Sequence, residues 1–90
     1  MLRINEELTQ RVPDGIKVVI EAEKPDELME PLATQIAREK AAQMGLNPSG
    51  IGNIYSPYAI DANTKEPIVD NTGTVGCFRI DVLCVSPIPV

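Results

Sequence analysis

The longest alternation of apolar and polar side chains, from Val75 to Val85, constrains the fold more than any other feature of the chain. Successive residues of a β-strand point to opposite faces of the sheet, so this run predicts a strand with one buried face. A second alternation, from Ile16 to Ala22, predicts another strand of the same kind. The residues predicted to face the core are Ile16, Val18, Ile20, Ala22, Phe78, Ile80, Val82 and Cys84.

The polar faces of these two runs carry complementary charges. Lys17 and Glu21 lie on the first run, and Arg79 and Asp81 lie on the second. Because opposite charges on facing strands stabilise the pairing, we predict that the two strands are neighbours in one sheet.

Between the two runs, apolar residues recur every three or four positions, which predicts an α-helix over about 27–44. Pro31 is tolerated only in a first helical turn, so the regular helix should begin near 28–30. Gly45 is expected to end the helix in a left-handed conformation. The two apolar rows are Leu28, Leu32 and Ile36, and Met29, Ala33, Ala37, Ala41 and Met44.

After the helix, residues 51–60 read as a strand that Pro57 interrupts, because proline cannot donate to a ladder. Residues 61–66 have the composition of a hairpin loop, and 67–69 are expected to return as a short strand. An interrupted strand of this kind is typical of a sheet edge.

These elements predict an α+β fold, a two-layer sandwich in which one main helix packs on a small mixed or antiparallel sheet in β-α-β-β order. We expect a single domain over 1–90. Residues 1–15 are predicted to form an arm or, with Asn5 as N-cap, a short helix over 5–11. Residues 86–90 are predicted to be an extended tail, since proline keeps them out of helix and central sheet.

The net charge of −5 disfavours direct nucleic-acid binding, since the phosphate backbone repels an acidic surface and the eight basic residues are scattered. No apolar run reaches the roughly 18 residues of a membrane span. Cys77 and Cys84 are expected on opposite faces of one strand, ~23 Å apart and too distant for a disulfide. We therefore expect reduced thiols and a cytoplasmic protein, or a particle assembled in the cytoplasm.

The sequence has no histidine. Serine–histidine and cysteine–histidine nucleophile pairs and histidine-containing zinc sites are therefore excluded within one chain. Two cysteines on opposite faces do not make a four-thiolate site. We expect no catalytic residues, no metal site and no cofactor.

Three surfaces are candidate interfaces. Tyr55, Pro57 and Tyr58 place two tyrosines around a proline, and tyrosine is enriched at protein interfaces. Ile88 and Val90 belong to the uncharged tail, which packs either on its own domain or on a neighbour. The third surface is an acidic run that either docks a basic partner or only supports a helix start, and it includes Glu23, Asp26 and Glu27.

The expected function is protein–protein contact by a non-enzymatic structural or assembly protein, as a homo-oligomer or as a small component of a larger complex, cellular or viral. One alternative is a small acidic inhibitor or adaptor that binds the basic surface of a nucleic-acid enzyme. The other is a domain that binds a small molecule between helix and sheet.

Overall fold

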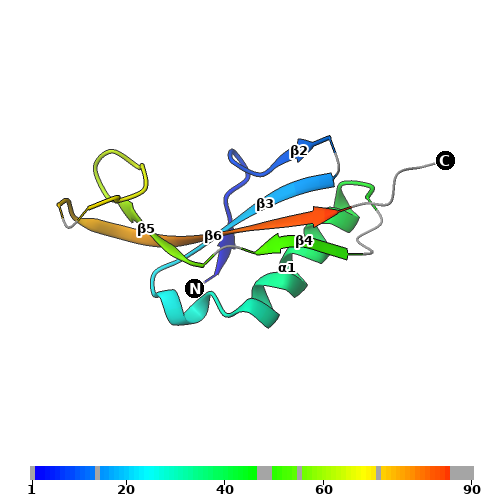
Figure 1. The fold of residues 1–90 in the computed structure, drawn as a ribbon, viewed down its shortest axis with the longest axis horizontal. Helices are drawn as coiled ribbons and strands as arrows, with labels where there is room; N and C mark the ends of the chain where they lie inside the picture. The colour runs from blue at the N-terminus through cyan, green and yellow to red at the C-terminus, as the bar shows by residue number, and fades with distance from the viewer. Residues whose placement is uncertain (1, 14, 47–49, 55, 71, 86–90) are drawn as a thin grey trace.

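The computed structural model of the chain describes residues 2–13, 15–46, 50–54, 56–70 and 72–85 (Figure 1). The protein has an α+β fold with one α-helix and an antiparallel sheet, so the predicted class is confirmed. The elements are β1 (Arg3–Ile4), β2 (Gln10–Val12), β3 (Gly15–Ala22), the 3-10 helix η1 (Pro25–Glu27), α1 (Glu30–Gln43), β4 (Gly50–Ile54), β5 (Tyr58–Asp61) and β6 (Val75–Val85).

Two long strands, β3 and β6, form the middle of the sheet, and every residue of β3 pairs with β6. Each outer edge consists of two short strands placed end to end. Strands β1 and β2 both pair with β3, and β4 and β5 both pair with β6. The predicted adjacency of the two alternating runs is confirmed, and Glu21 stands directly opposite Arg79.

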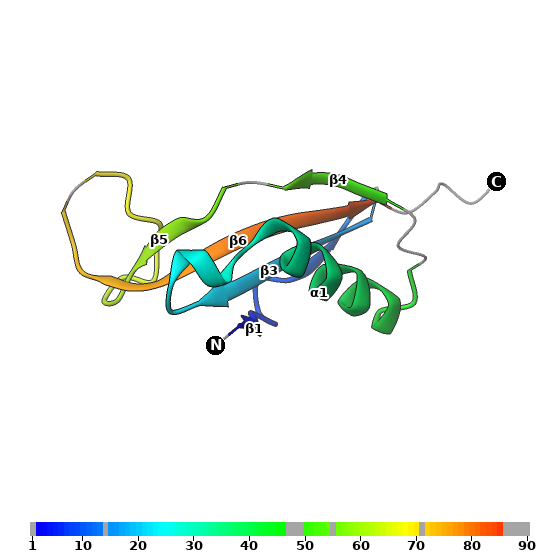
Figure 2. The same ribbon diagram turned by 90° about the horizontal axis from the view of Figure 1, so that it is seen from below.

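Helix α1 covers one face of the sheet, as Figure 2 shows. Ala33, Ala37 and Ala41 are fully buried against the predicted core residues of β3 and β6. Small alanine side chains let the helix lie close to the bulky β-branched residues of the strands. The helix begins at Glu30 with Pro31 in its first turn, and Gly45 follows it with φ +83°, as predicted.

The apolar row formed by Leu28, Leu32 and Ile36 is less buried than its spacing predicts. Leu28 is buried and Ile36 packs against the core, but Leu32 is 43% exposed.

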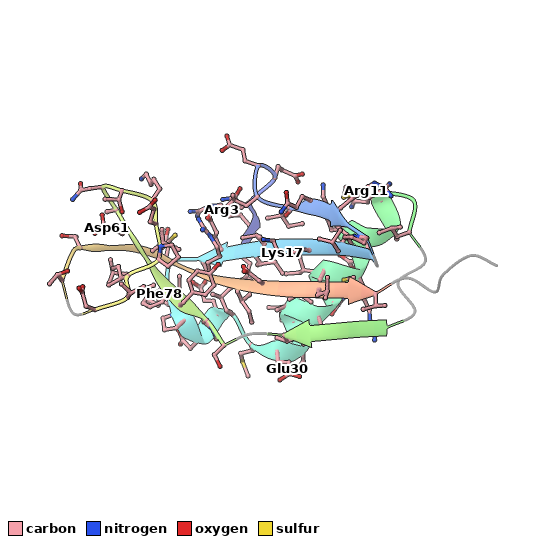
Figure 3. The ribbon with its side chains drawn as sticks, turned by 45° about the horizontal axis from the view of Figure 1, so that its top comes forward. Arg3, Arg11, Lys17, Glu30, Asp61 and Phe78 are labelled. Carbon is pink, nitrogen blue, oxygen red and sulfur yellow. The ribbon has the colours of Figure 1, made fainter. Side chains whose placement is uncertain are left out.

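Figure 3 labels Arg11, whose guanidinium donates to the Met44 carbonyl at the C-terminal end of α1, and Glu30 at the opposite end. No helix in the described ranges has the length and hydropathy to cross a lipid bilayer.

The predicted short helix over 5–11 is wrong. Asn5 does cap one turn, since its Oδ1 accepts the Leu8 N–H and its carbonyl accepts the Thr9 N–H. The chain then extends as β2, because pairing with β3 satisfies a row of backbone groups that one isolated helical turn leaves open. Two strands and a turn therefore precede β3, which the predicted β-α-β-β order did not contain.

The edge formed by β4 and β5 is interrupted around Pro57, as its sequence predicts. After β5 the chain folds back, and Ile60 forms an isolated bridge with Pro67. The Ile68 N–H also donates to the Ala59 carbonyl. The predicted returning strand is thus reduced to a single bridge, which places Pro67 and Ile68 beside β5.

Cys77 and Cys84 are both free and lie on opposite faces of β6, as predicted. Cys84 is in the core beneath α1, where burial raises the pKa of its thiol. Cys77 is half-buried on the other face.

The close approach of α1 to the sheet predicts that Ala37→Leu will lower the free energy of unfolding by about 1–3 kcal/mol, since the added volume has no space to occupy. Ala42 lies on the exposed side of the same helix. Ala42→Leu should therefore change stability by less than about 0.5 kcal/mol. Urea unfolding of both variants measures the difference, and equal effects would contradict the packing described here.

Candidate functional site

The face of the sheet opposite α1 holds two buried charged side chains, Glu21 on β3 and Arg79 on β6. Each residue is only 7% exposed. Charged groups are rarely buried to this degree unless they are paired, because removal from water is costly. This pair is therefore the starting point for a site.

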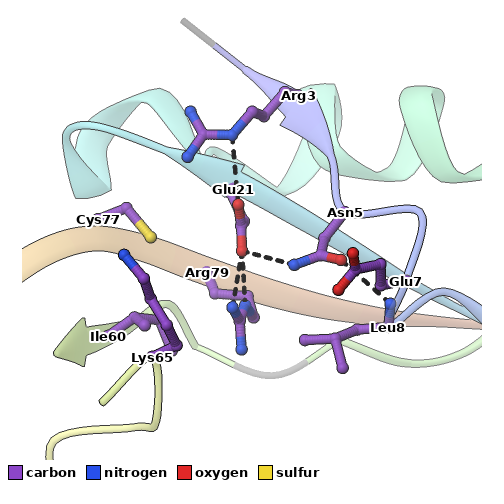
Figure 4. Close-up of a pocket in the computed structure, with 9 residues that line it drawn as sticks. All are labelled: Arg3, Asn5, Glu7, Leu8, Glu21, Ile60, Lys65, Cys77 and Arg79. Atoms are coloured by element: carbon purple, nitrogen blue, oxygen red, sulfur yellow. Dashed lines mark hydrogen bonds and ion pairs between the residues drawn. The ribbon is translucent and has the colours of Figure 1, made fainter. Parts of the chain in front are cut away.

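Glu21 is the centre of a hydrogen-bonded cluster, drawn in Figure 4. Arg79 donates to Glu21 Oε2 from Nε at 3.1 Å and from Nη2 at 2.7 Å. Asn5 Nδ2 donates to the same oxygen at 2.9 Å. On the other side, Arg3 Nε lies 3.3 Å from Glu21 Oε1. One carboxylate thus binds three donor side chains from three different strands or turns.

Strand register brings these residues together. Arg3 is the partner of Glu21 across β1 and β3, Glu21 is the partner of Arg79 across β3 and β6, and Tyr58 is the partner of Arg79 across β5 and β6. Directly opposed residues in antiparallel strands point to the same face and lie within reach of one another. The result is one polar row, Arg3–Glu21–Arg79–Tyr58, across the whole width of the sheet.

The hydrogen bonds of the cluster keep Glu21 and Arg79 ionised. Burial by itself would raise the pKa of Glu21, but the hydrogen bonds from Asn5 and Arg79 and the charges of Arg79 and Arg3 outweigh it, so the pKa is lowered. Burial would likewise lower the pKa of Arg79, and the hydrogen bonds and charge of Glu21 raise it instead. Glu21 is therefore an anion and Arg79 a cation at neutral pH.

Tyr58 ends the polar row with a hydrogen bond. Its hydroxyl donates to Asp81 Oδ1 at 2.9 Å. Burial of the ring, followed by the hydrogen bond to Asp81 and the negative charge of that residue, raises the pKa of Tyr58 to about 12. The hydroxyl is thus held as a neutral donor, and Asp81 is fixed in place beside the row.

A groove of about 440 Å³ lies over one end of the row. Arg3, Glu21 and Arg79 line it together with Lys65, and Leu8 and Ile60 add apolar surface. The turn after β1 supplies Leu8, and the connection after β5 supplies Lys65. Two segments without regular structure therefore complete a groove in which Arg3, Glu21 and Arg79 lie on strands.

The chemistry of this groove is that of charge recognition. In the described part of the chain, no group of three or more histidine, cysteine, aspartate or glutamate side chains could hold a metal ion. Arginine presents a planar fork of donors that matches a carboxylate, and lysine adds a point charge. The residues present can therefore bind and orient an anionic group.

The structure describes only some of the predicted interface residues. Tyr55, Ile88 and Val90 lie outside the described residues. Pro57 is exposed between β4 and β5, and Tyr58 is half-buried with its hydroxyl bonded to Asp81. The side chain of Tyr58 therefore belongs to the polar row and is not a free surface group.

The acidic run is placed at the corner between β3 and α1. Glu23 and Asp26 are exposed, and Glu27 is half-buried with a carboxylate that accepts the Lys24 N–H. Glu27 thus supports the start of η1, which is the second interpretation of the acidic run. Glu23 and Asp26 remain exposed, and so does Met29, which is 63% exposed.

Sequence reasoning did not single out Arg3 or Lys65, and it interpreted Asn5 only as a helix N-cap. The charge complementarity of Glu21 and Arg79 did predict that their strands are paired. It did not predict that both would be buried, since nothing local indicates which segments cover that face. Comparison of the chain with family models, curated proteins and solved structures yields no match.

The cluster around Glu21 predicts that Glu21→Gln will destabilise the fold by about 1.5–3 kcal/mol, the range for a lost hydrogen bond to a charged group. The folded-state pKa of Glu21 is below its ordinary value of 4.5. The contribution of its charge should therefore be complete above pH 4.5 and lost as the pH falls through the lower, folded-state pKa.

Urea unfolding at neutral and acidic pH measures this effect. Glu39→Gln removes a carboxylate from the exposed surface of α1 and is the matched control. It should leave stability within about 0.5 kcal/mol of the wild type. A Glu21→Gln variant as stable as this control would contradict the role given to Glu21.

The environment of Tyr58 predicts a late tyrosine titration. The Tyr55→Phe variant, in which Tyr58 is the one remaining tyrosine, should form tyrosinate with a midpoint near pH 12. Because the unfolded chain releases this proton near pH 10, stability should fall between pH 10 and 12. Ultraviolet absorbance gives the midpoint, and the fall in stability should be smaller in Tyr58→Phe. A midpoint near pH 10 would contradict the buried, bonded hydroxyl.

Proposed function

We propose that the protein acts through protein–protein contact, as a component of a larger complex, and that it has no catalytic role. The observation that carries the proposal is an exposed apolar stripe at the start of α1. Met29 is 63% exposed and Leu32 is 43% exposed, whereas the neighbouring Ile36 packs against the core. Large apolar side chains at such exposure often mark a surface that a partner covers.

Leu32 of the stripe shares one side of the helix with two later residues. Leu32, Ile36 and Lys40 are spaced four apart, so they share one side of α1. The ammonium group of Lys40 lies 2.7 Å from Glu6 Oε2, in the turn between β1 and β2. The bond holds the later turns of α1 at the N-terminal edge of the sheet. Figure 3 shows Glu30, at the start of the helix, on the opposite side, below β4.

The surroundings of the stripe indicate the chemistry of the partner. Glu23, Asp26 and Glu30 are exposed immediately before and within the first turn of α1. A surface with apolar side chains beside acidic ones complements a segment that carries both basic and apolar residues. We propose such a basic segment of another protein as the occupant. This assignment joins the acidic run to the apolar stripe in one docking surface, defined by Glu23, Asp26, Glu30, Met29 and Leu32.

A cytoplasmic site of action, or a particle assembled there, is part of the proposal. The free thiols of Cys77 and Cys84 support it, because disulfides persist in oxidising compartments.

The docking surface predicts the outcome of an affinity purification from the native source. The Met29→Ser/Leu32→Ser variant should retain a basic partner at least about ten-fold less well than the wild type, since it loses the apolar anchor. Charge reversal by Glu23→Lys/Asp26→Lys should also weaken retention of the partner, and this loss should be larger in low salt than in high salt. Quantitative mass spectrometry of the retained proteins measures both effects.

Val69→Ser is the matched control, because Val69 is 93% exposed on a different part of the surface. It should leave retention unchanged. The same partners at the same levels in all variants would overturn the proposal. If the purified wild type self-associates in sedimentation and Met29→Ser/Leu32→Ser does not, the occupant of the docking surface would be a second copy of the chain and not a basic partner.

A further inference from the structure

The groove on the face opposite α1 carries an unbalanced charge. Two guanidinium groups, of Arg3 and Arg79, share one buried carboxylate, that of Glu21. Lys65 and Glu7 also line the groove, so three cations face two carboxylates there. This local excess of positive charge lies in a chain whose net charge is −5.

The donors of the groove differ in how far they are already engaged. Arg79 is buried and directs Nε and Nη2 to Glu21. The side chain of Arg3 is 55% exposed, and it approaches Glu21 through Nε. Figure 4 draws the contact of Arg3 with Glu21 from Nε, and it shows the ammonium of Lys65 pointing towards Cys77. Arg3 and Lys65 are therefore the cations that can bind a further anion.

The groove also has apolar surface and limited size. Leu8 is exposed on the turn after β1, and the buried Ile60 lies at the base of the groove beside Cys77. A volume of about 440 Å³ is near the lower end of the range for small-molecule sites. The excess of one positive charge matches a single carboxylate, and the volume leaves room for a short carbon chain.

We propose that this groove binds a small organic monocarboxylate. Its carboxylate lies between Arg3 and Lys65, and its carbon chain lies over Cys77 and Ile60, on the side of the groove where Lys65 lies. Glu21 acts as a positioning residue, because its bonds to Arg3 and Arg79 orient the guanidinium of Arg3. The site is on the opposite face of the sheet from α1 and does not depend on the proposed docking surface.

Titration of the isotope-labelled protein with sodium butyrate, followed by amide resonances, tests the proposal. We expect saturable shifts for residues around the groove, among them Arg3 and Cys77, and none for α1. Arg3→Met should weaken binding by about ten-fold, the loss typical of one charge-assisted hydrogen bond. Lys65→Met, at an exposed position, gives an independent measurement in a variant whose folding is not in question.

Butyramide has the same shape without the charge, and inorganic phosphate has charge without the carbon chain. Neither should produce the saturable shifts of butyrate. Arg38→Met removes an exposed cation from α1 and should bind butyrate as the wild type does. Shifts that do not saturate, equal shifts with butyramide, or unchanged affinity in both Arg3→Met and Lys65→Met would overturn the proposal.

Discussion

The antiparallel pairing of β3 with β6 is the constraint on which the rest of the structure depends. All the short strands join one of these two, and α1 buries Ala33, Ala37 and Ala41 against both. The pairing also sets the two faces of the sheet, because it fixes which side chains of each strand point towards the helix. A shift of β3 by one residue would turn Glu21 towards the apolar core and turn Ile16, Val18 and Ile20 to the other face. The core and the polar row are thus two consequences of one register.

The elements with strong periodicity could be predicted from the sequence. The two alternating runs became β3 and β6, and the helix begins and ends where Pro31 and Gly45 indicate. The N-terminal segment could not be predicted in the same way. Asn5 does cap a turn there, but pairing with β3 decides the conformation of the residues that follow, and that pairing depends on a distant part of the chain.

The groove, as a candidate functional site, could likewise be predicted from the sequence only in part. Its charged centre follows from the complementarity of two strands, which the sequence displays. Its walls come from the turn after β1 and from the connection after β5, and no local pattern indicates that these two segments line the same groove. Lys65 has a positive φ of 64° in that connection, so the backbone there is shaped by the fold around it and not by the preference of the residue. Side chains from irregular segments are therefore the part of a site that periodicity leaves undetermined.

The end-to-end division of both sheet edges has a consequence for how other chains can approach. An unbroken edge strand offers a continuous row of backbone donors and acceptors, and such a row templates the addition of strands from any extended chain. Here the turn after β1 and the interruption at Pro57 divide each edge into strands of at most five residues. Backbone templating is thereby restricted to short stretches, which discourages stacking into fibres. Selectivity for a partner then depends on side-chain chemistry.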